Sequence, residues 1–385
     1  MMKRLLLLIL IMIIATGCNT NKGRTIILEN VTVIDGNGGE PLEDAVVVVE
    51  GEVITFVGKV YDFEKPEKAV TYDLQGATLL PGFINAHVHN AYSSKNLSTW
   101  AKSGITTVRD LGCRIKNPYE VRGKLLKSNK NARLVAAGPF ITTTQGYGDL
   151  EVNSLEDAVE TVQLLIDNNT DLIKVSYEDN LQGQRWNKLP KETLQAIVSL
   201  AHENNLRVSV HVSHRGQLED VIDAKVDDLA HMVIDLLSDE LIYRIVEEEI
   251  YWVPTLELWK GVSEDYPRSS FYIDIAKKNL KKFYEAGGKV ALGTDFGGYH
   301  TPFELGMPIM EIRLMEAAGM TPMDIIVSAT KNAAYVCNLE DEIGTIEVGK
   351  IADILIVKGN PLEELNFLLD VRMVLRNGQI IVNKK

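Results

Sequence analysis

Hydrophobic and polar positions along the chain follow two different patterns. Short apolar, β-branched runs separated by turn residues occupy both ends, at 26–33, 45–49, 53–57, 353–357, 371–375 and 379–382. Between these ends, apolar runs alternate with longer stretches of helical spacing, of which 155–168, 191–204 and 272–286 are the clearest. The short runs predict strands, and the alternation in the middle is typical of a parallel sheet covered by helices.

The middle region, 83–342, has the size of one (β/α)8 barrel, for which about 250 residues are typical. Eight strands are predicted in it, at 83–89, 105–110, 134–137, 172–176, 208–212, 229–231, 251–255 and 290–295. The strand-rich ends, 25–82 and 343–385, predict a small β-sandwich domain formed from both termini. The predicted fold class is therefore α/β, a (β/α)8 TIM barrel with a small β-sandwich domain.

The first 24 residues follow a pattern of their own. Two basic residues, Lys3 and Arg4, precede an apolar run at 5–15, which is shorter than the roughly 20 residues of a membrane-spanning helix. The sequence Ala-Thr-Gly then leads into Cys18 and resembles the lipobox of bacterial lipoproteins. The resemblance implies that 1–17 is a removed signal peptide and that 18–24 comprises a lipidated Cys18 and a tether. The exported protein would be anchored to the cell membrane or outer membrane, facing the periplasm or exterior. An uncleaved anchor is the alternative, and it leaves the domain on the same side of the membrane.

Composition narrows the range of partners. The 385 residues carry 40 basic and 53 acidic side chains, a net charge of −13, and 45% are hydrophobic. This hydrophobic content is that of a globular protein rather than a disordered chain. The acidic surplus argues against a nucleic-acid partner, because phosphate binding needs a basic surface. Three cysteines are too few for a disulfide framework, so Cys113 and Cys337 are predicted to be free thiols.

Six residues suited to metal binding lie at or near the ends of predicted strands. They are His87 and His89 in the first, Lys174 in the fourth, His211 in the fifth, His231 in the sixth and Asp295 in the eighth. Taken singly, each has an ordinary explanation, such as a packed histidine, a lysine reaching solvent or a capping aspartate. Together they favour a site for divalent ions such as Zn, because the strand ends of a barrel converge. Lys174 could take part only as a carbamate, since an ammonium group has no lone pair.

The order His-x-His, Lys, His, His, Asp resembles that of the amidohydrolase superfamily with a two-metal centre. The resemblance covers essentially the whole mature chain, through the motifs at 79–89, 105–112, 253–255, 293–295, 329–334 and 344–353. The most similar branch is the imidazolonepropionase-like group, which includes dipeptidases that cleave before proline. The resemblance therefore implies a metal-dependent hydrolase of carbon–nitrogen bonds.

The resemblance also implies roles for the six residues. His87, His89 and Asp295 would hold one divalent ion, and His211 and His231 would hold the second, with Zn expected for both. A carboxylated Lys174 and a hydroxide would bridge the two ions. Asp295 would pass a proton to the leaving nitrogen of a small amide, such as a dipeptide or an N-acyl amino acid. Lactonase or phosphoesterase chemistry, and a surface lipoprotein that binds a ligand without catalysis, are the alternatives; the oligomeric state stays open.

Residues on the predicted loops are candidates for contact with the small-molecule substrate. His214 is a second catalytic candidate, and Tyr147, Tyr177, Arg215 and His300 are candidate substrate-binding residues. Others that follow the last two strands are Glu257, Trp259 and Tyr299. The alternative for each is a solvated loop. The sequence departs from the branch in two loops. It has tyrosine at 147, where a histidine is common, and Ser-Tyr-Glu-Asp at 176–179, where glycines are expected. Because the first of these loops helps to line the substrate pocket of the branch, the resemblance does not identify the substrate.

Overall fold

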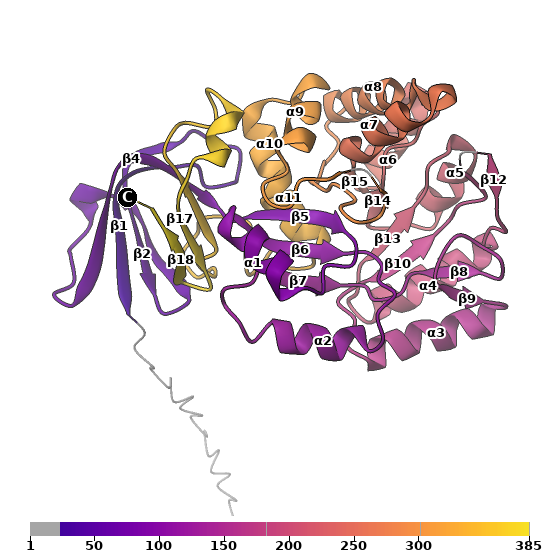
Figure 1. Cartoon of the computed structure of the whole chain (residues 1–385), viewed down its shortest axis with the longest axis horizontal. Helices are drawn as coiled ribbons and strands as arrows, with labels where there is room; N and C mark the ends of the chain where they lie inside the picture. The colour runs from indigo at the N-terminus through magenta and orange to yellow at the C-terminus, as the bar shows by residue number, and fades with distance from the viewer. Residues whose placement is uncertain (1–23, 182, 301, 385) are drawn as a thin grey trace, which may run out of the picture.

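The computed structural model describes residues 24–181, 183–300 and 302–384, which form a β domain beside a barrel (Figure 1). The predicted signal peptide, Cys18 and most of the predicted tether lie outside these described residues. Within the described part of the chain, no helix combines the length and the apolarity needed to cross a membrane.

The β domain is one seven-stranded sheet in the order β18-β17-β16-β4-β1-β2-β3. Its strands are β1 (Thr25–Val33), β2 (Leu42–Glu50), β3 (Val53–Lys59), β4 (Ala69–Pro81), β16 (Ile354–Val357), β17 (Val371–Arg376) and β18 (Gln379–Asn383). The long strand β4 joins the two ends of the chain, because it pairs with β1 on one side and with β16 on the other. β4 was not predicted from the sequence, and in its first half only Leu74 is fully buried.

The sheet curls until its two edges meet. The β2–β3 turn lies against the β17–β18 turn so closely that a Cβ on Gly378 would be 2.0 Å from the carbonyl oxygen of Gly51. Gly378 also has a φ of +67°, a conformation that favours glycine. Buried residues from both termini, such as Leu28, Val47 and Met373, share one hydrophobic core inside the curled sheet.

Eight parallel segments form the barrel. They are β5 (Phe83–Val88), β6 (Ile105–Asp110), β7 (Arg133–Ala136) with β8 (Ile141–Thr143), β10 (Ile173–Ser176), β13 (Val208–His211), β14 (Asp228–Ala230), β15 (Tyr251–Val253) and residues 290–296. The eighth segment closes the barrel through parallel bridges from Val290 to Trp252 and from Phe296 to Val88. Its approach requires Gly293, where a Cβ would lie 2.4 Å from the Val253 side chain and 2.8 Å from that of His87.

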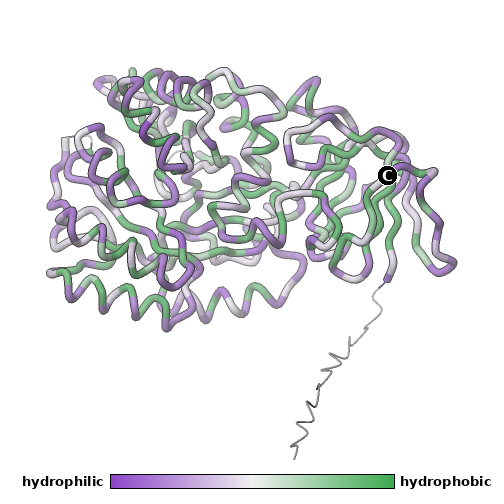
Figure 2. Tube along the Cα trace, turned by 180° about the vertical axis from the view of Figure 1, so that it is seen from behind, coloured by the Kyte–Doolittle hydropathy of each residue, from purple (hydrophilic) through white to green (hydrophobic). Residues whose placement is uncertain are grey.

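Helices cover the outside of the barrel (Figure 1). They are α1 (Ser94–Lys102), α2 (Pro118–Leu125), α3 (Leu155–Asp167), α4 (Lys191–Glu203), α5 (Arg215–Asp223), α6 (Asp239–Glu247), α7 (Leu256–Asp265), α8 (Tyr272–Glu285), α9 (Ile309–Ala317), α10 (Pro322–Ala329) and α11 (Lys331–Val336). In α3, Ala158, Val162 and Leu165 form the buried stripe, and the Ser154 hydroxyl caps the first turn. Figure 2 shows the resulting alternation of hydrophobic and hydrophilic positions along the helices.

Shorter elements complete the chain and connect its two parts. The strands β9 (Leu150–Val152), β11 (Asn180–Leu181) and β12 (Gln184–Arg185) lie on barrel loops, and the 3-10 turns are Val60–Asp62, Pro267–Ser269 and Leu365–Leu369. At the junction of barrel and β domain, the Asp353 carboxylate accepts a hydrogen bond from Arg133 at 2.8 Å. The Asp353 carbonyl accepts another from the backbone N–H of Gly82 at 2.8 Å, so the two domains are bonded where the chain crosses between them.

Candidate active site

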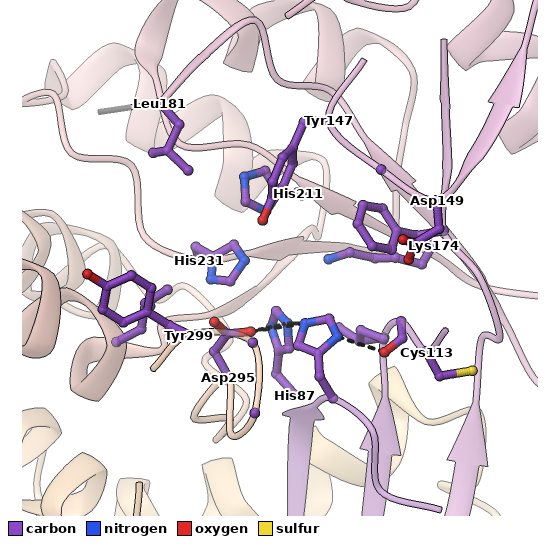
Figure 3. A pocket seen from close by; sticks show the side chains of 18 of the residues that line it. His87, Cys113, Tyr147, Asp149, Lys174, Leu181, His211, His231, Asp295 and Tyr299 are labelled. Carbon is purple, nitrogen blue, oxygen red and sulfur yellow. Dashed lines mark hydrogen bonds and ion pairs between the residues drawn. The ribbon is translucent and has the colours of Figure 1, made fainter. Parts of the chain in front are cut away.

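A cavity of about 600 Å³ opens at the carboxyl ends of the barrel strands (Figure 3). All six residues predicted as metal ligands line it: His87, His89, Lys174, His211, His231 and Asp295. They come from β5, β10, β13, the end of β14 and the eighth segment. The barrel thus brings together side chains that are up to 208 positions apart in the sequence, from His87 to Asp295.

His87, His89 and Asp295 are in direct contact. The Asp295 Oδ1 atom lies 3.2 Å from His87 Nε2 and 3.0 Å from His89 Nε2, and the two Nε2 atoms are 3.3 Å apart. The Nδ1 atom of His89 is 2.9 Å from the carbonyl oxygen of Gly112, which holds the ring with Nε2 toward Asp295. Burial alone would raise the pKa of Asp295, but the hydrogen bonds and charges of His87 and His89 hold it well below its ordinary value.

The other two histidines lie on the far side of this cluster. The His231 ring centroid is 4.7 Å from that of His87 and 4.6 Å from that of His211. His231 Nδ1 is 2.9 Å from the Thr255 hydroxyl oxygen, and His87, His231 and Asp295 offer ligand atoms that all lie within 4.8 Å of one another. Burial lowers the pKa of both His211 and His231, so each imidazole is neutral and keeps a lone pair for an ion.

Lys174 extends toward the same cavity (Figure 3). Its side chain is buried, and its Nζ atom has no hydrogen-bond partner among the described residues. Burial lowers the pKa of Lys174 to about 7, which avoids an unpaired buried ammonium. A neutral amine is the form that reacts with carbon dioxide to give a carbamate. An orphaned amine beside neutral imidazoles and a carboxylate therefore fits a metal centre with a bridging carbamate.

The backbone at three strand ends adopts the left-handed conformation. The φ angles are +75° at His231, +48° at Thr255 and +66° at Asp295, and Thr255 is β-branched, for which such a φ is unusual. The carboxylate of Glu311 accepts hydrogen bonds from the next two backbone N–H groups, of Leu256 at 2.8 Å and Glu257 at 2.6 Å. These two buried hydrogen bonds from Glu311 hold the backbone that follows Thr255 in place.

The loop residues predicted to contact the substrate divide into two groups. Tyr147, Trp259 and Tyr299 line the cavity, and the Tyr147 ring centroid is 4.9 Å from that of His211. Burial raises the pKa of Tyr147 to about 12, so its hydroxyl stays protonated near neutral pH. Glu257 is buried at the start of α7 and is not among the lining residues.

The structure does not bring Tyr177, His214, Arg215 or His300 to the cavity lining. The Tyr177 hydroxyl donates to Asp220 at 2.9 Å, and His214 Nδ1 is 3.2 Å from a carboxylate oxygen of Asp235. Arg215 is exposed at the first position of α5, where the chain turns away from the strand end. His300 Nε2 lies 3.0 Å from an oxygen of Asp265, outside the cavity.

Sequence reasoning did not single out several residues that shape the site. Phe140, Leu181, Trp186, Leu258 and Val262 give the cavity apolar walls, and the Tyr147 and Trp186 ring centroids are 5.1 Å apart. They lie on loops and on α7, where no periodic pattern gives a side chain's direction. Cys113 also lines the cavity, and both Cys113 and Cys337 are free.

Glu178 is a further residue that the sequence did not assign. It is buried, with Oε2 at 3.5 Å from His211 Nε2. Burial acts to raise the pKa of Glu178, but the nearby His211 ring and the hydrogen bond from Ser213 hold it below its ordinary value. The signal was present in the sequence, as an acidic residue four positions after Lys174 in a loop where glycines were expected.

The chain matches the amidohydrolase family over residues 78–381. It belongs to this family. The prediction of the superfamily and its fold class, a (β/α)8 barrel with an added β domain, is therefore confirmed. This amidohydrolase is a hydrolase that acts on carbon–nitrogen bonds, and its family is metal-dependent.

Relatives of this amidohydrolase span nearly its whole length. Ochratoxinase of Aspergillus niger is 25% identical, covering 92% of this chain and 86% of that protein. Imidazolonepropionase of Shouchella clausii is 22% identical, covering 89% and 86%. The crystal structure of a Xaa-Pro dipeptidase with bound methionine in its active site matches with a TM-score of 0.81 at 26% identity, covering 92% of this chain and 99% of that one.

Proposed function

We propose that this amidohydrolase cleaves an amide or peptide bond in a small substrate such as a dipeptide or an N-acyl amino acid. The observation that carries the proposal is the convergence of four histidines, Lys174 and Asp295 in one cavity. Relatives named as an ochratoxinase and a Xaa-Pro dipeptidase support it. The apolar cavity walls suit the groups that flank such a bond.

The proposed cofactor is a pair of divalent ions, with Zn expected because the donors are imidazole and carboxylate. His87, His89 and Asp295 would hold one ion, and His211 and His231 the other. Lys174, as a carbamate, would provide the oxygens between them. When bound, such ions lower the pKa of water and polarise a carbonyl group.

Asp295 is the proposed proton carrier. Its carboxylate is ionised and lies at the contact point of His87 and His89, which leaves it able to accept a proton from the attacking water. It then delivers that proton to the leaving nitrogen. A C–O bond forms, the C–N bond breaks, and the products are an acid and an amine.

We further propose that the protein is an exported lipoprotein attached to a membrane through lipidated Cys18. The support is the sequence pattern of 1–18. Replacing Cys18 by serine should abolish labelling with a radioactive fatty acid and release the protein from the membrane fraction. Continued labelling of that variant would contradict the proposal.

Metal analysis combined with a substrate panel tests the enzymatic proposal. The chain from residue 19 onward, produced with added zinc, should contain bound metal and hydrolyse dipeptides or N-acyl amino acids in a chelator-sensitive way. Less than one metal ion per chain together with no chelator-sensitive hydrolysis would contradict it. Lactones and phosphoesters belong in the same panel, because faster turnover of either would favour the corresponding alternative.

A further inference from the structure

Glu178 is a buried carboxylate beside the proposed metal centre that the six-residue ligand set leaves unexplained. It lies in the loop that follows β10, and only 1% of its surface is exposed. Its Oε2 atom is 3.5 Å from His211 Nε2, slightly beyond an ordinary hydrogen bond. An isolated buried carboxylate would be costly, so its partners are informative.

Four donors fix the Glu178 carboxylate. Its Oε1 accepts the backbone N–H groups of Asp179 and Asn180 at 3.1 Å each and the Gln217 amide at 3.2 Å. Its Oε2 accepts the hydroxyl of Ser213. These bonds come from the Glu178 loop, from the loop after β13 and from α5. The carboxylate is therefore held in one orientation, with Oε2 directed at the histidine.

The nitrogen of His211 that faces Glu178 is otherwise unsatisfied. Nε2 is buried and has no hydrogen-bond partner within ordinary limits among the described residues, and Glu178 Oε2 at 3.5 Å is the acceptor it faces. A carboxylate only accepts, so its natural complement is a protonated Nε2. In that tautomer the lone pair is on Nδ1, which is then the atom available to an ion.

His211 differs in this respect from two other histidines of the cavity. His89 and His231 each use Nδ1 for their supporting contact, to Gly112 and Thr255 respectively. In these two the nitrogen left for an ion is Nε2. His211 has the reverse arrangement, and Glu178 is the group that would impose it.

We infer that Glu178 is a positioning residue of the proposed metal centre, which holds His211 protonated at Nε2 and presents Nδ1 to the ion. The inference rests on the proposed function for the identity of the ion. Glu178, one of two acidic residues at 176–179, would thus support the second pair of proposed ligands.

The first experiment measures the tautomer of His211 in the metal-free protein. Nitrogen-15 NMR of labelled histidine distinguishes the two ring nitrogens, and a His211→Gln variant assigns the signal among the seven histidines of the chain. At a pH where the ring is neutral, His211 should be protonated at Nε2, and Glu178→Leu should abolish that preference. Protonation at Nδ1 in the unaltered protein would overturn the inference.

The second experiment measures affinity for zinc by competition with a chelator. Glu178→Gln should weaken binding of one of two zinc ions by about 10- to 100-fold, as expected for loss of an outer carboxylate. Asp179→Asn is the matched control, because the Asp179 carboxylate also accepts from Gln217 but makes no hydrogen bond or ion pair with His211. Ser213→Ala removes one hydrogen-bond donor to Glu178 and should lower zinc affinity by a smaller factor. This variant provides the test if Glu178→Gln does not fold.

The two readouts separate the possible failures. Zinc affinity equal to that of the unaltered protein in both Glu178→Gln and Ser213→Ala would overturn the positioning role. A changed absorption spectrum of the cobalt-loaded Glu178→Gln protein, showing loss of a ligand oxygen, would also overturn it, because Glu178 would then bind the ion itself. If no form of the protein binds zinc, the proposed function fails, while the tautomer of His211 still decides whether Glu178 positions the ring.

Discussion

The two halves of the proposed metal centre are built differently. His87, His89 and Asp295 contact one another, with the carboxylate of Asp295 at 3.0–3.2 Å from both imidazoles. No carboxylate in the described part of the chain is shared in this way by His211 and His231, and each is instead held by a residue behind it, Glu178 or Thr255. The first half thus contains a carboxylate that joins its members, with Gly112 as an outside support for His89, whereas the second half depends on residues outside the ligand set.

This difference gives the two halves different sensitivities. Substitutions behind the ligands should affect mainly the ion held by His211 and His231, because those rings lose their orientation. Substitution of Asp295, which is proposed both to hold an ion and to carry a proton, should lower turnover most. The experiments below are arranged by the expected size of their effects.

The largest effect is expected for Asp295→Asn. The amide cannot take up the proton that the carboxylate accepts, so kcat should fall by about 10²- to 10⁴-fold, the usual share of a general acid–base group. At least one metal ion should remain bound, since four histidines and Lys174 are unchanged. Turnover and metal content are measured on the same preparation.

Asp149→Asn is the matched control for Asp295→Asn. Asp149 also lines the cavity, but its carboxylate pairs with Arg114 at 3.0 Å and contacts none of the histidines. Its substitution should leave kcat within a few-fold of the unaltered enzyme. Turnover of Asp295→Asn at the unaltered rate would remove the proton-carrying role.

Lys174→Ala is expected to weaken binding of both metal ions. If the carbamate of Lys174 joins the two ions, its removal should lower total metal content, and short carboxylic acids should partly restore it. Lys188→Ala is the control, because Lys188 lies over the Tyr177 ring away from the cavity. Full metal content in Lys174→Ala would show that the amine takes no part in binding.

A loss confined to the second half is expected for Thr255→Val. The change keeps the shape of the side chain but removes the oxygen that lies 2.9 Å from His231 Nδ1. Affinity for one of two zinc ions should fall by about 10-fold, at the low end for lost outer-shell partners. Equal weakening of both ions would contradict the division into two halves.

Thr106→Val provides the control for Thr255→Val. The Thr106 hydroxyl is buried and has no hydrogen-bond partner among the described residues. Replacing it by a methyl group is therefore the same chemical change as in Thr255→Val, but no hydrogen bond is lost. Its zinc affinity should match that of the unaltered protein. A parallel fall in both variants would trace the effect to packing rather than to His231.

The convergence of the six proposed ligands was predictable because strand geometry determines their positions. Side chains two apart on a strand share a face, which places His87 and His89 together, and a barrel brings all its strand ends to one rim. Helical periodicity was equally informative, since the predicted helix at 155–168 ends one residue beyond α3 (Leu155–Asp167). In both cases the repeat of the secondary structure, two residues in a strand and about 3.6 in a helix, determines which way a side chain points.

The loops were not predictable to the same degree, because their side-chain directions depend on tertiary contacts. Tyr177 follows β10 directly, yet its hydroxyl points to Asp220, while the next residue, Glu178, reaches His211. His214 lies three residues after His211 and pairs with Asp235 because α5 begins immediately after it. The first half of β4 was also missed, although Val70, Tyr72 and Leu74 alternate there with polar residues, and the pairing with β1 fixes its register.

The smallest effect is expected for Tyr147→Phe, which tests whether the cavity wall helps to organise the second half. The Tyr147 ring packs 4.9 Å from that of His211, and phenylalanine preserves this packing while removing only the hydroxyl. Zinc affinity should stay unchanged, and KM should rise by about 2- to 10-fold, equivalent to one hydrogen bond of about 0.5–1.5 kcal/mol. Because burial raises the pKa of Tyr147 to about 12, the alkaline limb of the rate profile should be the same in both proteins below that pH. Weaker zinc binding by Tyr147→Phe would instead add the cavity wall to the groups, Glu178 and Thr255, on which the second half depends.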